Sequence, residues 1–180
     1  MDDLQFVTAI TSGDRDAFRS LVEREQTPVF RTCYRVLGRI TDAEDATQET
    51  FVIAYRSIGT YRGEGTLGAW LGRIATRQAL RRLGQRKDAL SIDTPGLPLG
   101  TTGGMDPLGQ AIAAERATRV RAAVAALREP YRETVALRYF AELSLAEIAE
   151  QTGRPLGTVK THLHRGLDRL REAMGHEVAA

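Results

Sequence analysis

Residues 143–174 read LSLAEIAEQTGRPLGTVKTHLHRGLDRLREAM and predict two short helices that meet at a tight turn. Ser144 can cap the first helix because Glu147 follows three residues later, and Gly153 is suited to end that helix. Pro155 fits near the start of the second helix. The apolar positions of the second helix recur every three or four residues, at Val159, Leu163, Leu167 and Leu170. This pattern is typical of a helix-turn-helix.

The other face of the second helix carries basic and hydrogen-bonding side chains. They are Lys160, Thr161, His162, His164 and Arg165, and no acid occurs between Glu150 and Asp168. Helix pairs with glycine turns occur in many helical proteins, but an ordinary solvated helix usually mixes both signs of charge. The acid-free face therefore favours the major groove of DNA. The two histidines point to different sides of the helix, which argues against a metal site there.

The length and composition limit the classes of protein to which the chain can belong. The chain has 180 residues, of which 42% are hydrophobic, as in a globular protein of one domain or two small ones. It has no apolar run long enough to cross a bilayer, and its start, MDDLQFVTAI, lacks the basic-then-apolar order of a signal peptide. We therefore expect a cytoplasmic protein. Cys33 is the only cysteine, which excludes an internal disulfide, and we expect its thiol to be buried.

The charges are segregated along the chain, although the formal net charge is only +2. Residues 70–87 contain six basic residues and no acid, whereas residues 40–55 contain four acids and no base. Such segregation predicts two different partners, one of them a polyanion and the other basic.

The first part of the chain predicts three helices. Residues 2–10 form a short one, and Asp14 begins a longer one in which Pro28 either causes a kink or starts a further helix. Thr41 or Asp42 can cap the third.

This third helix has an acidic face. Asp42, Asp45 and Glu49 fall within about 60° of one another on a helical wheel and are extended by Gln48. Favourable charges at a helix N-terminus explain the first two acids better than Glu49. A carboxylate metal site is a third interpretation, but no histidine or second acidic cluster supports it. We expect no metal and no cofactor.

A loop and a basic helix follow. Residues 57–66, SIGTYRGEGT, are rich in glycine and predict the loop. The helix that follows reads TLGAWLGRIATRQALRRLGQRK. Its expected core positions are Leu67, either Trp70 or Leu71, and Ile74, with Gln78 as a further candidate. Arg73, Arg77 and Arg81 are spaced i, i+4, i+8 and form a basic ridge whose mutual repulsion a polyanion would relieve.

The chain is predicted to be all-α, with two small helical domains. Residues 88–107 hold four glycines and three prolines and predict a flexible linker between domains at 1–87 and 108–180. Helical patterns resume at Leu108 and again in PYRETVALRYFAEL, where Pro130 suits a first turn. These two helices are expected to cover the inner face of the helix-turn-helix.

In this order, the motifs resemble bacterial RNA polymerase sigma factors of the sigma-70 family, of the extracytoplasmic-function type. DAEDATQETF, the glycine-bearing loop and GTLGAWLGRIATRQALRRL look like the family's region 2. The stretch from PYRETV to DRLRE looks like region 4. LuxR-type regulators carry a similar helix-turn-helix, but both motifs in one chain across a linker are far more specific.

The resemblance assigns roles to the charged surfaces. It implies that Asp45, Gln48 and Glu49 dock on the clamp helices of the polymerase beta-prime subunit, and that the beta flap is a further contact. It implies that the loop and basic helix melt and hold the minus-10 element of the promoter, through Tyr61, Arg62, Trp70, Arg73, Arg77 and Arg81. We expect Trp70 to lie mostly in the core and Tyr61 to be the better base-stacking candidate.

The resemblance also places the helix-turn-helix at the minus-35 element. Lys160, Thr161, His164 and Arg165 would contact base edges or nearby phosphates, with Thr158 and Arg154 closer to the backbone. The family often has Arg at the position of Lys160, so the preferred minus-35 sequence is expected to differ.

The resemblance implies a transcription initiation subunit that has no catalytic site or small-molecule substrate and is held inactive by an anti-sigma factor. A free-standing helix-turn-helix repressor or activator is the main alternative, but it leaves the acidic face without a purpose. A metal-dependent nuclease that acts through the acidic cluster is a more remote alternative.

Overall fold

The computed structural model describes residues 2–88 (the first half) and 107–175 (the second half), and within them all regular secondary structure is helical, as predicted. The elements are α1 Asp3–Thr11, α2 Arg15–Leu37, α3 Ile40–Ser57, the 3-10 helix η1 Ile58–Thr60, α4 Leu67–Asp88, α5 Pro107–Ala126, α6 Tyr131–Tyr139, α7 Leu145–Thr152 and α8 Leu156–Met174. The outermost residues of the predicted linker belong to α4 and α5, and positions 89–106 lie outside the described residues. No helix in the described halves is long and apolar enough to span a membrane.

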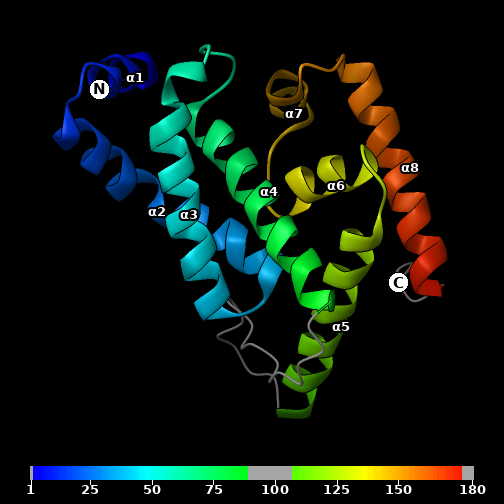
Figure 1. Ribbon diagram of the computed structural model, residues 1–180. Helices are drawn as coiled ribbons and strands as arrows, with labels where there is room; N and C mark the ends of the chain where they lie inside the picture. Colours follow the sequence, from blue (N-terminus) through cyan, green and yellow to red (C-terminus); the bar gives the residue numbers. More distant parts are fainter. Residues whose placement is uncertain (1, 89–106, 176–180) are drawn as a thin grey trace.

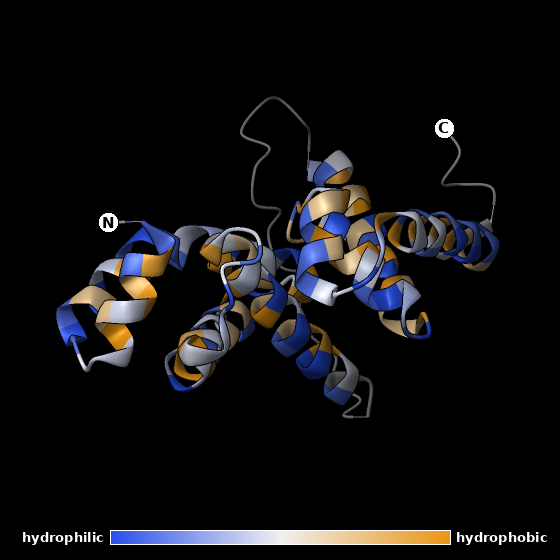
Figure 2. Cartoon of the chain, turned by 90° about the horizontal axis from the view of Figure 1, so that it is seen from above, coloured by the Kyte–Doolittle hydropathy of each residue, from blue (hydrophilic) through white to orange (hydrophobic). Residues whose placement is uncertain are grey.

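Helix α4 lies at the centre of the molecule. In the first half it packs against α2 and α3, and α1 lies across α2. Its other side contacts α6 and α7, so that α4 is the part of the first half that packs against the second half (Figure 1). The largest hydrophobic cluster is continuous across them: Leu21 and Leu71 belong to the same cluster as Val135 and Leu170. In both halves, hydrophobic positions lie on parts of the helices that face neighbouring helices (Figure 2). The halves therefore share one core.

Helix α2 is a single element. Asp14 caps it by accepting hydrogen bonds from the backbone N–H groups of Asp16 and Ala17. Gly38 ends it in the left-handed region, at φ 73°. Pro28 lies inside the helix, so it does not start a second one.

The predicted cap of α3 was wrong. Helix α3 begins at Ile40, and the capping position belongs to Arg39, which makes no side-chain capping bond. The left-handed turn at Gly38 redirects the chain so quickly that the new helix begins before Thr41 is reached. Asp42 instead lies in the first turn, where a negative charge is favourable.

The helix-turn-helix forms as predicted. The Ser144 hydroxyl accepts from the Glu147 N–H at 3.2 Å, and the Glu147 carboxylate accepts from the Ser144 N–H at 2.8 Å. Gly153 ends α7 at φ 66°. Pro155 occupies the capping position of α8, and the predicted apolar stripe faces inward from Val159 onward. Helices α5 and α6 cover this inner face, with Pro130 immediately before α6.

Gly166 marks the closest approach of α8 to α6. A Cβ atom at this buried position would lie 2.7 Å from Cγ2 of Val135, which is itself fully buried. We expect Gly166→Ala to lower the free energy of unfolding by about 1–3 kcal/mol, because the core has no room for the methyl group. Chemical denaturation measures the change. Gly157→Ala on the same helix is the control: its Cβ would meet nothing within 4 Å, so stability should hold or rise by up to ~1 kcal/mol. Equal effects of the two substitutions would contradict this account.

Cys33 is fully buried, as predicted. Burial raises the pKa of its thiol to about 11, against smaller lowering effects of hydrogen bonds with Thr47 and Thr50. About one thiol in a thousand is then ionised at pH 8, and only the thiolate is nucleophilic. We expect iodoacetamide to label the folded protein at least ~100-fold more slowly than a free cysteine. Labelling followed by mass spectrometry tests this, and rapid labelling without unfolding would contradict it.

Candidate nucleic-acid interface

The loop between η1 and α4 is built around Tyr61. This side chain is only 8% exposed, and its hydroxyl donates to the carbonyl of Gly65 at 2.7 Å. Gly63 and Gly65, at φ 76° and 71°, let the loop close over the ring. Trp70 packs edge-on to Tyr61 at 6.0 Å between ring centroids and is only partly buried. The expected accessibility of Tyr61 was therefore wrong, because this ring belongs to the core. Trp70 packs against the core, as expected, but is the more accessible of the two rings.

Both halves of the chain hold this loop in place. The Asp3 carboxylate accepts from the backbone N–H of Leu67 at 2.6 Å and from the Arg24 guanidinium at 2.9 Å, and so anchors the first turn of α4. From the second half, the side-chain amide of Gln151 donates to the carbonyl of Glu64 at 2.9 Å. Sequence reasoning missed both contacts because each joins residues more than 60 positions apart, where no local pattern gives a signal.

The predicted basic ridge divides between two carboxylates. Arg77 donates to Oε1 of Glu133 through Nη2 at 2.7 Å and Nε at 3.0 Å, and the Nε of Arg73 lies 3.4 Å from the same oxygen. Arg154 of the helix-turn-helix reaches Oε2 of Glu133 at 3.1 Å. Arg81 turns the other way and pairs with Glu49 at 2.7 Å. Sequence reasoning did not single out Glu133.

Glu133 is 6% exposed and remains ionised at neutral pH. Burial alone would raise the pKa of this carboxyl, but Arg77 and Arg73 together lower it below its ordinary value. The ion pairs of Glu133 therefore stabilise the folded protein fully when the pH is above the ordinary carboxyl pKa. This stabilisation is lost only when the pH falls through the lowered pKa of Glu133. The Arg73 side chain is 24% exposed, and its burial, together with the neighbouring Arg77, lowers the pKa of its guanidinium.

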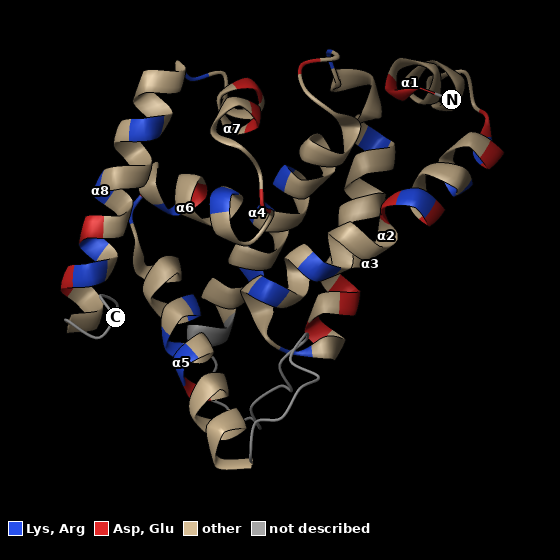
Figure 3. Cartoon of the chain, turned by 180° about the vertical axis from the view of Figure 1, so that it is seen from behind, with Lys and Arg blue, Asp and Glu red and all other residues tan. Residues whose placement is uncertain are grey.

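The acidic face of α3 lies beside the end of the basic helix (Figure 3). Arg82 lies 3.3 Å from Asp45 and 3.4 Å from Glu49, and Arg81 completes the group. The two oppositely charged segments therefore pair with each other, which the prediction of two outside partners did not include. The Asp45 side chain is still 62% exposed and Gln48 is exposed. Exposed pairs of this kind contribute at most about 1 kcal/mol each, so the face can still bind a basic partner.

The outer face of α8 is open. Lys160, Thr161, His164 and Arg165 are all exposed and, at i, i+1, i+4 and i+5, lie on one side of the helix. Within the described part of the chain, Lys160 and Arg165 form no ion pair, while the His164 ring lies 3.3 Å from Asp168. Thr158 is half-buried. The structure thus groups four of the six predicted minus-35 residues on one surface and places Arg154 against Glu133 instead.

His162 does not belong to this surface, contrary to the prediction that placed it on the exposed face. Its ring packs edge-on to Tyr131 at 5.8 Å, and burial, with the nearby Arg154 and Arg165, lowers its pKa. Across the described residues, no three His, Cys, Asp or Glu side chains are grouped so that they could hold a metal ion.

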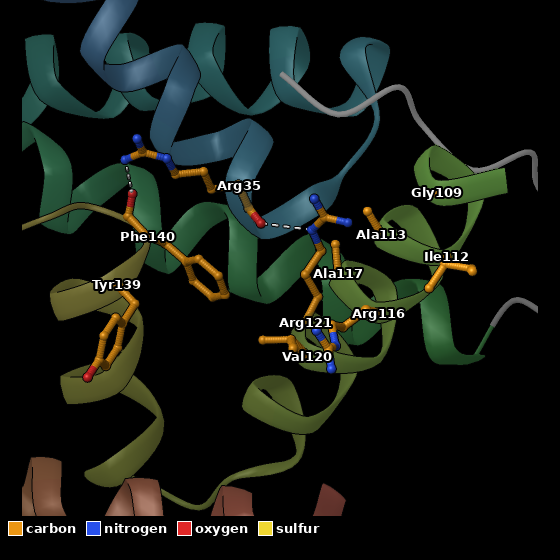
Figure 4. Close-up of a pocket in the computed structure, with 10 residues that line it drawn as sticks. All are labelled: Arg35, Gly109, Ile112, Ala113, Arg116, Ala117, Val120, Arg121, Tyr139 and Phe140. Atoms are coloured by element: carbon orange, nitrogen blue, oxygen red, sulfur yellow. Dashed lines mark hydrogen bonds between the residues drawn. The ribbon is translucent and has the colours of Figure 1, made fainter. Parts of the chain in front are cut away.

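A cleft of about 610 Å³ separates α5 from the ends of α2 and α6. Arg35 of α2 donates to the carbonyl of Phe140 at 3.2 Å, and its own carbonyl accepts from Nε of Arg121 at 2.8 Å (Figure 4). Tyr139 and Ile112 contribute exposed apolar surface to the cleft walls. The two arginines thus join the halves at the end opposite the loop.

Comparison with known families matches both halves of the chain. The family model for Sigma-70 region 2 matches residues 21–88, and that for Sigma-70, region 4 matches residues 117–170. The ECF RNA polymerase sigma factor SigW of Bacillus subtilis is 34% identical over 176 residues, which cover 93% of this chain and 94% of that protein. The ECF RNA polymerase sigma-E factor of Haemophilus influenzae is also 34% identical, over 92% of this chain and 91% of its own length.

Two solved structures have a similar fold. One is CnrH in complex with the cytosolic domain of CnrY, with a TM-score of 0.63 and 21% identity over 97% of this chain and 98% of that one. The other is the sigma factor RpoE from Bartonella quintana in complex with the anti-sigma factor NepR, with a TM-score of 0.55 and 20% identity over 87% of this chain and 96% of that one.

Proposed function

Since the chain belongs to the sigma-70 family, as a sigma factor of the extracytoplasmic-function type, we propose that it binds core RNA polymerase and directs transcription from promoters with defined minus-10 and minus-35 elements. The observation that carries this proposal is the combination, in one chain, of an exposed acidic face on α3 and an acid-free, outward-facing recognition surface on α8. A helix-turn-helix repressor needs only the second surface.

The core-binding face comprises Asp45, Gln48 and Glu49, which would contact the clamp helices of the beta-prime subunit. Arg81 and Arg82 cover this face only with exposed or half-exposed ion pairs. A basic partner helix can replace such pairs at little cost, because each contributes at most about 1 kcal/mol. The beta flap would be a second polymerase contact, made by the second half.

The minus-10 surface comprises Arg62, Trp70, Arg73 and Arg77 around the loop, with Arg81 at its edge. Unpairing DNA costs a few kcal/mol, offset by base stacking and by phosphate neutralisation. The structure favours Trp70 for stacking because Tyr61 is committed to the loop's own core. Tyr61 then acts as the support of the loop.

The minus-35 surface comprises Lys160, Thr161, His164 and Arg165, which would enter the major groove, with Thr158 and Arg154 at its edge. A free Lys160 and a free Arg165 fit base edges or phosphates directly. We further propose that the chain has no catalytic site, acts in the cytoplasm beside the polymerase and is regulated by an anti-sigma protein. Support for the regulator comes from the bound anti-sigma factor of the Bartonella quintana structure.

In vitro transcription with purified core polymerase on a randomised promoter library tests the function. We expect transcripts that depend on the protein and start downstream of one shared pair of elements. If no transcript depends on it and it does not co-elute with core polymerase, the repressor interpretation takes over.

A further inference from the structure

The N-terminal helix α1 lies along η1 and the loop that leads into α4. A Cβ at Gly59 would lie 3.7 Å from Cγ2 of Thr11, and a Cβ at Gly63 would lie 3.4 Å from Cδ2 of Leu4. We propose that α1 holds this loop in the conformation that captures the minus-10 strand, and that Asp3 is the positioning residue through which it does so. This inference rests on the proposed function of the minus-10 surface.

The Asp3 carboxylate joins three helices. Its Oδ2 accepts from the backbone N–H of Leu67 at 2.6 Å, and its Oδ1 accepts from Nη2 of Arg24 in α2 at 2.9 Å. Arg24 is itself held in place, because its guanidinium lies 4.7 Å from the centre of the Phe6 ring and its Nε donates to Glu25 at 2.7 Å. Asp3 thus ties the first residue of α4 to both α1 and α2.

Helix α4 does not need Asp3 in order to begin. The Thr66 hydroxyl accepts from the N–H of Ala69 at 3.1 Å, which is the usual bond of a capping residue, and the Thr66 carbonyl accepts from the N–H of Trp70. Leu67, however, is fully buried, and a buried N–H without a partner costs free energy. Without the Asp3 carboxylate, we expect the helix to persist while its first turn shifts until water reaches the Leu67 N–H.

Such a shift acts on the proposed site of base capture. Trp70, the ring that is accessible for stacking, lies in the same first turn, and Arg73 follows it on the next turn. A binding group has to be held close to its productive geometry by the residues that support it. Asp3 therefore contributes to promoter opening through Leu67 and Trp70.

Two substitutions of Asp3 test this role in the complex with core polymerase. The probe is a non-template-strand oligonucleotide that carries the minus-10 sequence selected from the promoter library. We expect Asp3→Ala to weaken its binding by about 10- to 100-fold, the range for one lost hydrogen bond to a charged group. Asp3→Asn should lose only about three- to tenfold, because an amide oxygen can still accept from Leu67 in a bond roughly half as strong. Asp16→Ala is the matched control: it removes the same charge from an exposed pair on α2 and should leave binding unchanged.

A spectroscopic measurement separates positioning from general stability. Trp70 is the only tryptophan of the chain, so the emission of the purified protein reports on the first turn of α4. Asp3→Ala should shift this emission to longer wavelength as the ring gains contact with water, whereas Asp3→Asn and Asp16→Ala should emit like the wild type. Affinity for core polymerase and for minus-35 duplex DNA should hold in all three variants, because the contacts of Asp3 are with α2 and α4.

The outcomes separate this inference from the proposed function. If Asp3→Ala leaves both oligonucleotide affinity and Trp70 emission as in the wild type, α1 does not position the loop, although the protein still acts as a sigma factor. If core and minus-35 affinity fall as much as minus-10 affinity, Asp3 only stabilises the fold and the positioning role is wrong. If the wild-type protein selects no minus-10 sequence at all, it is the proposed function that fails.

Discussion

Replacing both Asp45 and Glu49 by Lys is expected to abolish binding to core RNA polymerase. The two carboxylates lie on one face of α3, and Asp45 is largely exposed. Reversal places like charges opposite a basic partner, which costs several kcal/mol across an interface. Because each 1.4 kcal/mol is a factor of about ten, affinity should fall at least a hundredfold. Co-elution with core polymerase and a direct binding titration measure the loss.

The reversal also places the new lysines beside Arg81 and Arg82, so its effect on folding has to be separated from its effect on docking. Asp45→Asn with Glu49→Gln removes the attraction without adding repulsion and should give an intermediate loss. Glu115→Lys with Glu172→Lys makes the same total charge change at exposed sites of α5 and α8 and should leave core binding intact. Core binding that survives the double reversal would show that the docking assignment is wrong.

Replacing Arg165 by Ala is expected to weaken promoter recognition at particular minus-35 positions by roughly 1–3 kcal/mol each. Arg165 is exposed on the outer face of α8 and forms no ion pair within the described halves, so its guanidinium is free to bind a base edge bidentately. Competition binding of the holoenzyme to promoters with single substitutions measures the loss position by position.

The control for Arg165 lies on the same helix. Arg171 carries the same charge, points to another side and pairs with Asp168 at 2.7 Å, so Arg171→Ala should change promoter affinity by no more than about 0.5 kcal/mol. A uniform loss across all promoter sequences with Arg165→Ala would identify Arg165 as a phosphate contact. No loss at all would remove it from the interface.

The parts of the structure that follow from short stretches of sequence could be predicted. The capping pair Ser144 and Glu147, the stop at Gly153 and the apolar stripe beginning at Val159 are local signals, and the structure has each of them. The acidic face of α3 was predictable for the same reason, since helical periodicity alone places Asp45 and Glu49 together.

The parts that depend on distant contacts could not be predicted. Tyr61 was expected to be accessible because it lies in a glycine-rich loop, but the ring packs against Trp70 and its hydroxyl finds a partner in Gly65. The burial of Glu133 becomes understandable only when Arg73 and Arg77 of α4 surround it together with Arg154, which lies in the turn between α7 and α8. Periodicity gives the face on which a residue lies, but not the element that will cover that face.

The shared core has a consequence for the chain as it leaves the ribosome. Leu71 of α4 belongs to the same apolar cluster as Leu170 near the end of α8. At a synthesis rate of about 5–20 residues per second, the hundred or so residues between them take roughly 5–20 s to appear. Until α6 and α7 emerge, the side of α4 that faces the second half has no covering layer. A nascent first half is therefore exposed to chaperones and to other nascent chains until these helices arrive, and the shared core is complete only when α8 joins it.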